Sequence, residues 1–162
     1  MKVITAPEKF EEYPKIYTIF LAGSIEQGSA VNWQDIVIDT LKYFDNIRVL
    51  NPRRTHWDST WEQTLDNSKF VEQVNWELKG CCIADVVLMY FDPNTKSPIS
   101  LLELGNLANG SNYGQYQIVC CPDGFWRKGN VELFCKFYDL KFTHTLPEFL
   151  DKVMELVGWH VK

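Results

Sequence analysis

One carboxylate in this sequence stands where it could act on a bound molecule. Glu103 lies between two leucines in residues 97–105, which read SPISLLELG. This pattern predicts that Glu103 falls in the first turn of a helix that follows a loop, where free backbone N–H groups stabilise an anion. Burial between leucines acts in the opposite direction, because desolvation raises the pKa of a carboxyl group. The position of Glu103 in the sequence fits two interpretations equally well. It is either a functional carboxylate or one that only interacts favourably with the helix dipole.

Two more carboxylates are candidates for the same chemistry. Glu77 follows Trp76 near the end of a predicted helix, and it becomes a partner for Glu103 only if its side chain turns toward that residue. Asp85 directly precedes an apolar run that reads VVLMYF. We interpret Asp85 mainly as a structural residue that bonds loop amides, with a catalytic role as the alternative.

A turn with little side-chain bulk follows the first apolar run. It consists of Ala22, Gly23, Ser24 and Ile25, with Gly28 shortly after. Small residues let the backbone approach a ligand closely, so Gly23, Ser24 and Ile25 are candidate binding residues. The segment has neither the GxGxxG pattern of a dinucleotide site nor the GK[ST] pattern of a phosphate-binding loop, so neither site is predicted.

The longest irregular segment, residues 53–67, is polar and rich in tryptophan. A loop of this length inside a small domain is usually functional when it is ordered. Arg53 could hold a phosphate or a carboxylate together with Arg54, although such a pair more often divides between an ion pair and a solvated residue. We predict that this loop forms part of a recognition pocket, with Trp57 and Asp58 among its contacts.

The composition is ordinary for one soluble domain. The 162 residues are 46% hydrophobic and 23% charged, and the net charge of −5 disfavours binding to duplex nucleic acid. The sequence contains no long apolar run, so we expect no signal peptide and no membrane-spanning segment. The five cysteines are an odd count without metal-ligand spacing, which predicts reduced, buried thiols in a cytoplasmic protein and no metal site.

Apolar periodicity predicts alternating strands and helices behind these loops. The expected strands cover residues 16–21, 47–50, 86–91, 117–121 and 140–142. The expected helices cover residues 32–44, 68–82, 100–110, 130–138 and 147–157, with Asn32 as an N-cap. Residues 1–15 are interpreted as a loose N-terminal arm and residues 16–162 as a single domain. The alternation is typical of an α/β fold with a doubly wound parallel sheet of about five strands and helices on both faces.

In such a sheet, ligands bind beyond the carboxyl ends of the strands, at the point where the strand order reverses. Three loops, residues 23–28, 51–61 and 92–100, are therefore expected to lie together. This arrangement would place Glu103 directly behind the third of these loops.

Six short motifs occur in order along the chain. They are FLAGSI at 20–25, WQ at 33–34, NPRR at 51–54, QVNWE at 73–77, ADVVL at 84–88 and SPISLLELG at 97–105. Together they resemble the nucleoside 2-deoxyribosyltransferase family, in order, from about residue 16 to residue 130. The resemblance implies a flavodoxin-like fold and cleavage of an N-glycosidic bond, a reaction that needs neither a metal nor an organic cofactor.

The resemblance also implies roles for three residues. Glu103 is the match to the nucleophile that attacks the anomeric carbon and forms a covalent glycosyl-enzyme, as in retaining glycosidases. Glu77 matches an acidic residue that helps to place the base or the sugar. Asn130 matches an asparagine that a neighbouring subunit contributes, which implies a homo-oligomer with shared active sites.

Other positions depart from the family pattern. Ser97 stands about where classical members carry an aspartate that handles the proton of the leaving base, and nearby Asp92 is a candidate to replace it. Ser97 and Ser100 could instead hold a 5′-phosphate, as serines do in nucleotide hydrolases of the superfamily. The alternatives to a transferase are therefore a 2′-deoxynucleoside 5′-monophosphate N-glycosidase and a non-catalytic nucleotide-binding protein.

Aromatic residues make up 14% of the chain and supply two further expectations. Trp33, Trp57 and Trp76 are candidates to stack on the base of a nucleoside or nucleotide. A second aromatic group is crowded into residues 125–138 and exceeds what a short peripheral helix buries. This crowding indicates a subunit interface, the alternative being that the rings pack within their own subunit.

Overall fold

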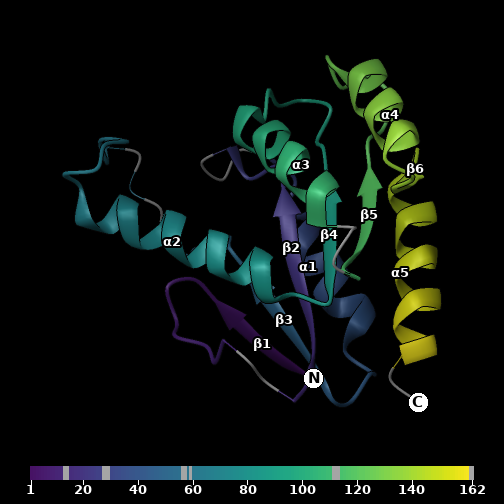
Figure 1. The fold of residues 1–162 in the computed structure, drawn as a ribbon, viewed down its shortest axis with the longest axis horizontal. Coiled ribbons are helices and arrows are strands. Elements are labelled where there is room, and N and C mark those ends of the chain that lie inside the picture. The colour runs from purple at the N-terminus through teal and green to yellow at the C-terminus, as the bar shows by residue number, and fades with distance from the viewer. Residues whose placement is uncertain (13–14, 27–29, 56–57, 59, 111–113, 161–162) are drawn as a thin grey trace.

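Six parallel strands form one sheet in the part of the chain that the structure, a computed structural model, describes (Figure 1). The described residues are 1–12, 15–26, 30–55, 58, 60–110 and 114–160. The strands are β1 (Lys2–Thr5), β2 (Tyr17–Gly23), β3 (Ile47–Asn51), β4 (Val86–Tyr90), β5 (Tyr116–Cys120) and β6 (Lys141–Thr143). Their order across the sheet is β1-β3-β2-β4-β5-β6, which confirms the predicted doubly wound α/β fold.

Helices cover both faces of this sheet (Figure 1). They are α1 (Trp33–Leu41), α2 (Ser68–Ile83), α3 (Pro98–Gly110), α4 (Lys128–Phe137) and α5 (Leu146–His160). Val86 and Leu88 of β4 point to the layer of α1 and α5, whereas Val87 and Met89 point to the layer of α2, α3 and α4. Burial on both faces explains why β4 is apolar throughout. No helix within the described ranges is both long and apolar enough to cross a membrane.

The sixth strand lies where the sequence predicts a loose arm, residues 1–15. Lys2–Thr5 pair in parallel with Arg48–Asn51 of β3, and Ile4 is buried in the core. The expectation of an arm is wrong for these residues because a four-residue edge strand buries too few side chains to show a period of its own. Pairing with β3, a contact distant in sequence, makes the strand.

The strand order reverses between β2 and β4, so their carboxyl ends define the ligand-binding edge of this fold. Gly23 ends β2 with a φ of +120°. A Cβ atom on Gly23 would lie 2.2 Å from the Tyr90 carbonyl oxygen, so only glycine fits. The Ser24 N–H donates to the same oxygen at 2.8 Å, which holds the loop after β2 against the end of β4.

Candidate active site

Buried hydroxyl groups join the loops that follow β2 and β4. The Ser24 and Ser97 Oγ atoms lie 2.6 Å apart, and Thr95 Oγ1 lies 2.7 Å from Ser97 Oγ. Ser24 Oγ also accepts the Asp92 N–H at 2.8 Å. The two loops therefore meet as predicted, and their serines are fixed next to the start of α3.

Asp92 ties the same loops together. Its carboxylate accepts the N–H groups of Val31 at 2.7 Å and Asn94 at 2.9 Å, and the residue is only 1% exposed. Both carboxylate oxygens thus have backbone partners inside the protein. This geometry gives no support to the expectation that Asp92 handles the proton of a leaving base, and it makes Asp92 a residue that shapes the loops.

Arg53 joins the loop after β3 to the segment between β2 and α1. Its guanidinium donates to the carbonyls of Ala30 and Val31 at 3.0 and 3.1 Å, and to the Gln34 side-chain oxygen at 3.3 Å. The sequence predicted a contact to a phosphate or carboxylate for this arginine. In the structure its contacts hold the segment that leads into α1, because backbone carbonyls in a buried loop need donors.

Glu103 lies in the second turn of α3, since the helix begins at Pro98 rather than near residue 100. The expectation of a first-turn carboxylate is therefore wrong, and the Glu103 N–H lies beyond the free donors of the helix start. Burial raises the pKa of the Glu103 carboxyl to about 8, and the negative charge of Glu77 is the second cause. Of the two opposing effects that the sequence suggested, only the effect of burial acts on Glu103 in the structure.

Glu77, on α2, is the carboxylate that lies near Glu103, since its charge contributes to the raised pKa of that residue. Burial also raises the pKa of Glu77, whereas a hydrogen bond from Gln73 and the charge of Arg54 lower it. Two neighbouring carboxylates repel each other, so the pair favours holding one proton. Gln73 and Arg54 lower the pKa of Glu77 but not that of Glu103. The proton of the pair therefore resides preferentially on Glu103.

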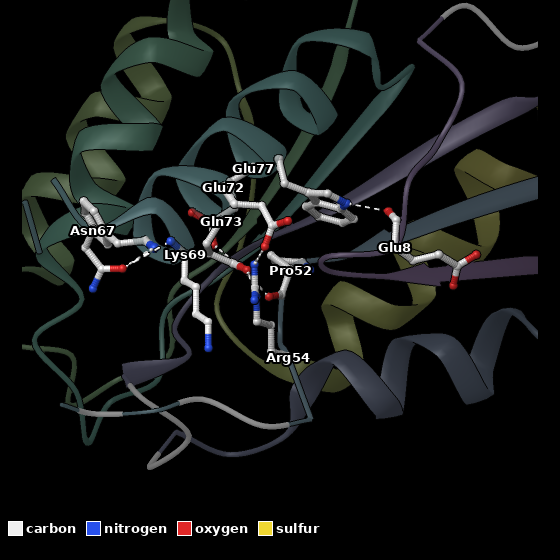
Figure 2. A network of polar contacts seen from close by, with 10 residues as sticks. Glu8, Pro52, Arg54, Asn67, Lys69, Glu72, Gln73 and Glu77 are labelled. Carbon is white, nitrogen blue, oxygen red and sulfur yellow. Dashed lines mark hydrogen bonds and ion pairs between the residues drawn. The ribbon is translucent and has the colours of Figure 1, made fainter. Parts of the chain in front are cut away.

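A polar network holds Glu77 in place (Figure 2). The Gln73 amide donates to Glu77 Oε1 at 2.7 Å and to the Pro52 carbonyl at 2.9 Å. The Gln73 oxygen accepts from Arg54 Nε, and Arg54 also pairs with Glu72 at 3.1 Å. The NPRR motif is thereby connected to Glu77. Gln73 was not a candidate from sequence, although its spacing of four residues from Glu77 on a helix could have indicated the contact.

Two of the candidate tryptophans belong to the core. Trp33 is 0% exposed, and its indole N–H donates to the Ser24 carbonyl at 3.0 Å. Trp76 is also buried, with its ring packed edge-on against Phe10. Neither ring offers a free face for base stacking, because its own chain covers it. Trp57, the third candidate, lies outside the described residues.

Asp85 lies at the opposite edge of the sheet, before the amino end of β4. Its carboxylate accepts the Thr18 N–H at 2.7 Å, and its own N–H donates to the Thr18 carbonyl at 2.9 Å. These contacts join the starts of β2 and β4. They account for Asp85 as a structural residue, and the catalytic alternative gains no support.

The remaining candidates are divided between the loops and the helix starts. Ser100 is buried in the first turn of α3, and Ile25 is half-buried in the loop after β2. Asp58 accepts the Thr60 N–H at 2.9 Å, and hydrogen bonds from Thr60 lower its pKa. Asn130 is exposed near the start of α4. Across the described ranges, no three ligating side chains gather in a way that could hold a metal ion.

The cysteines depart in part from the expectation of buried thiols. All five are free, and Cys120, Cys121 and Cys135 are buried. Cys81 lies half-buried on α2, where burial and, second, the charge of Glu103 raise the thiol pKa, whereas Cys82 is exposed. Two adjacent helical residues point in different directions, so the Cys81-Cys82 pair could not both be buried on one face.

Glu103→Gln should make the folded protein more resistant to heat at alkaline pH. The Glu103 pKa is about 8 in the folded state against 4.5 for the free side chain, so the folded state holds the extra proton between these values. Stability of the wild type therefore falls as the pH rises through this window, while glutamine does not titrate. The difference in Tm, variant minus wild type, should be near zero at pH 4. The difference in Tm should reach several degrees at pH 9, because for a chain of this length each kcal/mol of unfolding free energy shifts Tm by roughly 2–4 °C.

Thermal unfolding followed by circular dichroism at pH 4, 6 and 9 measures this difference. Asp151→Asn is the control, because Asp151 is exposed on α5 and removal of its charge should give a nearly constant difference. A pH-independent difference for Glu103→Gln as well would show that the Glu103 carboxyl is not held neutral by burial.

Known proteins share both the sequence pattern and the fold. Residues 16–125, more than half of the chain, match the model of the family described as nucleoside 2-deoxyribosyltransferase like. No curated protein matches the chain significantly. A crystal structure of a conserved protein from Enterococcus faecalis V583 aligns with a TM-score of 0.60 and 10% identity, and the alignment covers 86% of this chain and 98% of that one. The family match includes Glu77 and Glu103, and the chain belongs to the nucleoside 2-deoxyribosyltransferase-like family.

Proposed function

We propose that this protein cleaves the N-glycosidic bond of a deoxynucleoside and transfers the 2-deoxyribosyl group to a second base, with Glu103 as the nucleophile. The observation that carries the proposal is the pairing of Glu103 with Glu77. The two carboxyls come from adjacent helices, both have raised pKa values, and both lie within the matched family region. Such pairs of perturbed carboxyls are typical of sites that perform acid–base and nucleophilic chemistry.

The reaction proceeds by two displacements at the anomeric carbon. The Glu103 carboxylate attacks C1′ of the sugar, the C1′–N bond breaks, and its electron pair leaves with the base. The product is a glycosyl ester on Glu103 together with a base that has taken up one proton. A ring nitrogen of the acceptor base then attacks C1′, the ester bond breaks, and the Glu103 carboxylate is released as the acceptor loses its proton.

The proton shared by the carboxyl pair fits the first step. Glu103 must ionise to act as a nucleophile, and the leaving base must gain a proton. Gln73 and Arg54 favour the charged form of Glu77, so before the reaction the proton of the pair favours Glu103. Transfer of this proton toward the base, directly or through Glu77, activates the nucleophile and the leaving group together.

Assays with and without a free acceptor base test the proposal. The purified protein is incubated with each of the four common 2′-deoxynucleosides, and products are separated by chromatography. Exchange of the base only when an acceptor is present supports transfer. Release of free base from a 5′-monophosphate without acceptor identifies the hydrolase alternative, and tight binding without turnover of any substrate identifies a binding protein.

We propose that the protein is a homo-oligomer in which Asn130 contributes to the active site of a neighbouring subunit. The aromatic residues around α4 divide into two groups. Phe125 is buried and lies 4.9 Å from Phe91 between ring centroids, so it belongs to the core. Phe137 is 81% exposed, and the aliphatic Leu133, one turn earlier on the same helix, is 69% exposed. Large exposed apolar side chains on one helix support an interface with a second copy, and closed symmetry is the common outcome.

Hybrid oligomers should recover activity that neither parent has. Glu103→Ala and Asn130→Ala proteins are expected to be inactive alone, because each site lacks one of its residues. After subunit exchange, about a quarter to a half of the sites combine two intact residues, so partial activity should return. Lack of recovery after exchange has been verified by mass spectrometry, or an active monomer by light scattering, would remove the shared site.

A further inference from the structure

Residues 8–12, which follow β1, are attached to α2. The Trp76 indole N–H donates to the Glu8 carbonyl at 2.8 Å, a contact drawn in Figure 2. The Phe10 ring meets the Trp76 ring edge-on, with 5.2 Å between the ring centroids. Edge-on pairs of aromatic rings stabilise a contact beyond the area that they bury. This part of the N-terminal segment is therefore a partner of the helix rather than a loose arm.

The same segment is fixed to the sheet by Arg48 of β3. Arg48 Nη1 donates to the Glu11 carbonyl at 2.9 Å, and the guanidinium lies 5.6 Å from the centre of the Phe10 ring, in range of a cation–π interaction. Arg48 is itself buried, and β3 has a strand on each side. Phe10 thus connects an inner strand of the sheet to the Trp76 ring.

Trp76 is the main apolar anchor of α2. The buried residues of this helix are Gln73, Trp76 and Gly80, and only Trp76 among them has a large apolar side chain. Gly80 allows close approach to the sheet, because a Cβ atom there would lie 2.9 Å from the Phe20 ring. Trp76 packs against Phe20 as well, at 6.3 Å between ring centroids. The position of α2 on the sheet therefore depends strongly on the side chains that surround Trp76.

A change in that position acts directly on the carboxyl pair. Glu77 follows Trp76 in the chain and accepts a hydrogen bond from Gln73 of the same helix at 2.7 Å, so it moves with α2. Glu103 belongs to α3. The interaction between two charges weakens as their separation grows, so a displacement of α2 alone changes the effect of Glu77 on Glu103.

We propose that Phe10 is a positioning residue: through Trp76 it fixes α2 at the place from which Glu77 acts on Glu103. This inference rests on the proposed function. Phe10 does not touch the substrate in this scheme. Removal of its ring leaves a cavity beside Trp76, and α2 relaxes into that space. The two carboxyls are then misaligned, although both are present.

A double-mutant cycle between Phe10 and Glu77 tests the proposal. We expect Phe10→Ala to lower kcat/KM for base exchange by at least about tenfold, mainly through kcat, because small misplacements of catalytic groups have effects of this size. In the Glu77→Gln background the same substitution should lower kcat/KM by less than about twofold, since the group that it positions is already absent. Phe10→Leu keeps more apolar volume and should give a smaller loss with the same dependence on Glu77, which preserves the test if Phe10→Ala does not fold.

Phe44→Ala is the matched control. Phe44 is a partly buried phenylalanine after α1, and it packs against the core on the opposite face of the sheet from Trp76. Its loss should lower Tm as Phe10→Ala does, but it should change kcat/KM by less than about threefold and equally in both backgrounds. An equal loss for Phe10→Ala in both backgrounds would overturn the inference and leave Phe10 as a packing residue.

Thermal unfolding provides a second measurement that needs no turnover. Displacement of Glu77 lowers the pKa of Glu103, so Phe10→Ala loses less stability than the wild type as the pH rises from 4 to 9. The Tm deficit of the variant should therefore be smaller at pH 9 than at pH 4, by about 2 °C, whereas Phe44→Ala should keep a constant deficit. A pH-independent deficit for Phe10→Ala would reject the positioning role. Failure of the proposed function is distinct, because the wild type would then cleave no nucleoside, and the thermal measurement would still decide whether Phe10 sets the carboxyl pair.

Discussion

Replacing Glu103 by glutamine should lower the rate of glycosyl transfer by at least about a thousandfold, as the loss of a nucleophile does in other covalent mechanisms. The amide has the shape of the carboxyl but cannot form the glycosyl ester, so the first displacement fails. The fold should remain intact, because the Glu103 carboxyl is held largely neutral at neutral pH by burial and by Glu77. Steady-state assays of base exchange measure the loss, and circular dichroism checks the fold.

The covalent intermediate provides an independent measurement. A 2-fluoro sugar nucleoside slows the second displacement, so mass spectrometry of a peptide digest should find the sugar attached to Glu103. The Glu103→Gln protein is the control and should carry no adduct. Wild-type transfer by Glu103→Ala, or an adduct on another residue, would assign the nucleophile elsewhere.

Glu77→Gln is expected to lower kcat/KM by about a hundredfold, the usual scale for loss of a general acid–base partner. It should also shift the pH dependence, because removal of a neighbouring negative charge lowers the pKa of Glu103. Because the proposed mechanism passes the proton of Glu103 to the leaving base, activity falls as the pH increases through that pKa. The falling limb of the profile should therefore move to lower pH in the variant, and its midpoint reports the carboxyl pair rather than one residue.

The matched control for this variant is Glu72→Gln. Glu72 lies on the same helix and pairs with Arg54, but it is exposed, and the neighbouring charge that raises the pKa of Glu103 is that of Glu77. Its removal should change kcat/KM by less than a few-fold and leave the pH profile in place. A Glu77→Gln protein with an unshifted profile would show that the two carboxyls act independently.

Local signals in the sequence determine the layered fold. Residues 86–91 read VVLMYF, and a short apolar run of this kind fits a strand with helices on both faces, which β4 is. Asn32 indicates the start of α1, and its side-chain oxygen does accept the Asp35 N–H. These signals depend on neighbours along the chain, so they can be interpreted without the tertiary structure. β1 lacks such a signal because its pairing partner lies more than forty residues away.

The order of the motifs also singles out Glu103, but it says nothing about the proton that Glu103 carries. The pKa of about 8 arises because the Glu103 carboxyl is buried and because Glu77 lies nearby. Neither effect can be derived from spacing along the chain, since burial and charge depend on the distance between helices. Sequence reasoning therefore identifies the carboxyl, and only packing decides its charge.

The division of polar and aromatic residues between site and scaffold is decided by the tertiary structure alone. Trp33, Asp92 and Arg53 have side chains suited to ligand contacts, and each is instead engaged with loop backbone. The physical reason is that buried backbone groups must find partners, and in these loops the partners come from segments distant in sequence. Glu26 and Ser97, which meet across 71 residues, show the same principle.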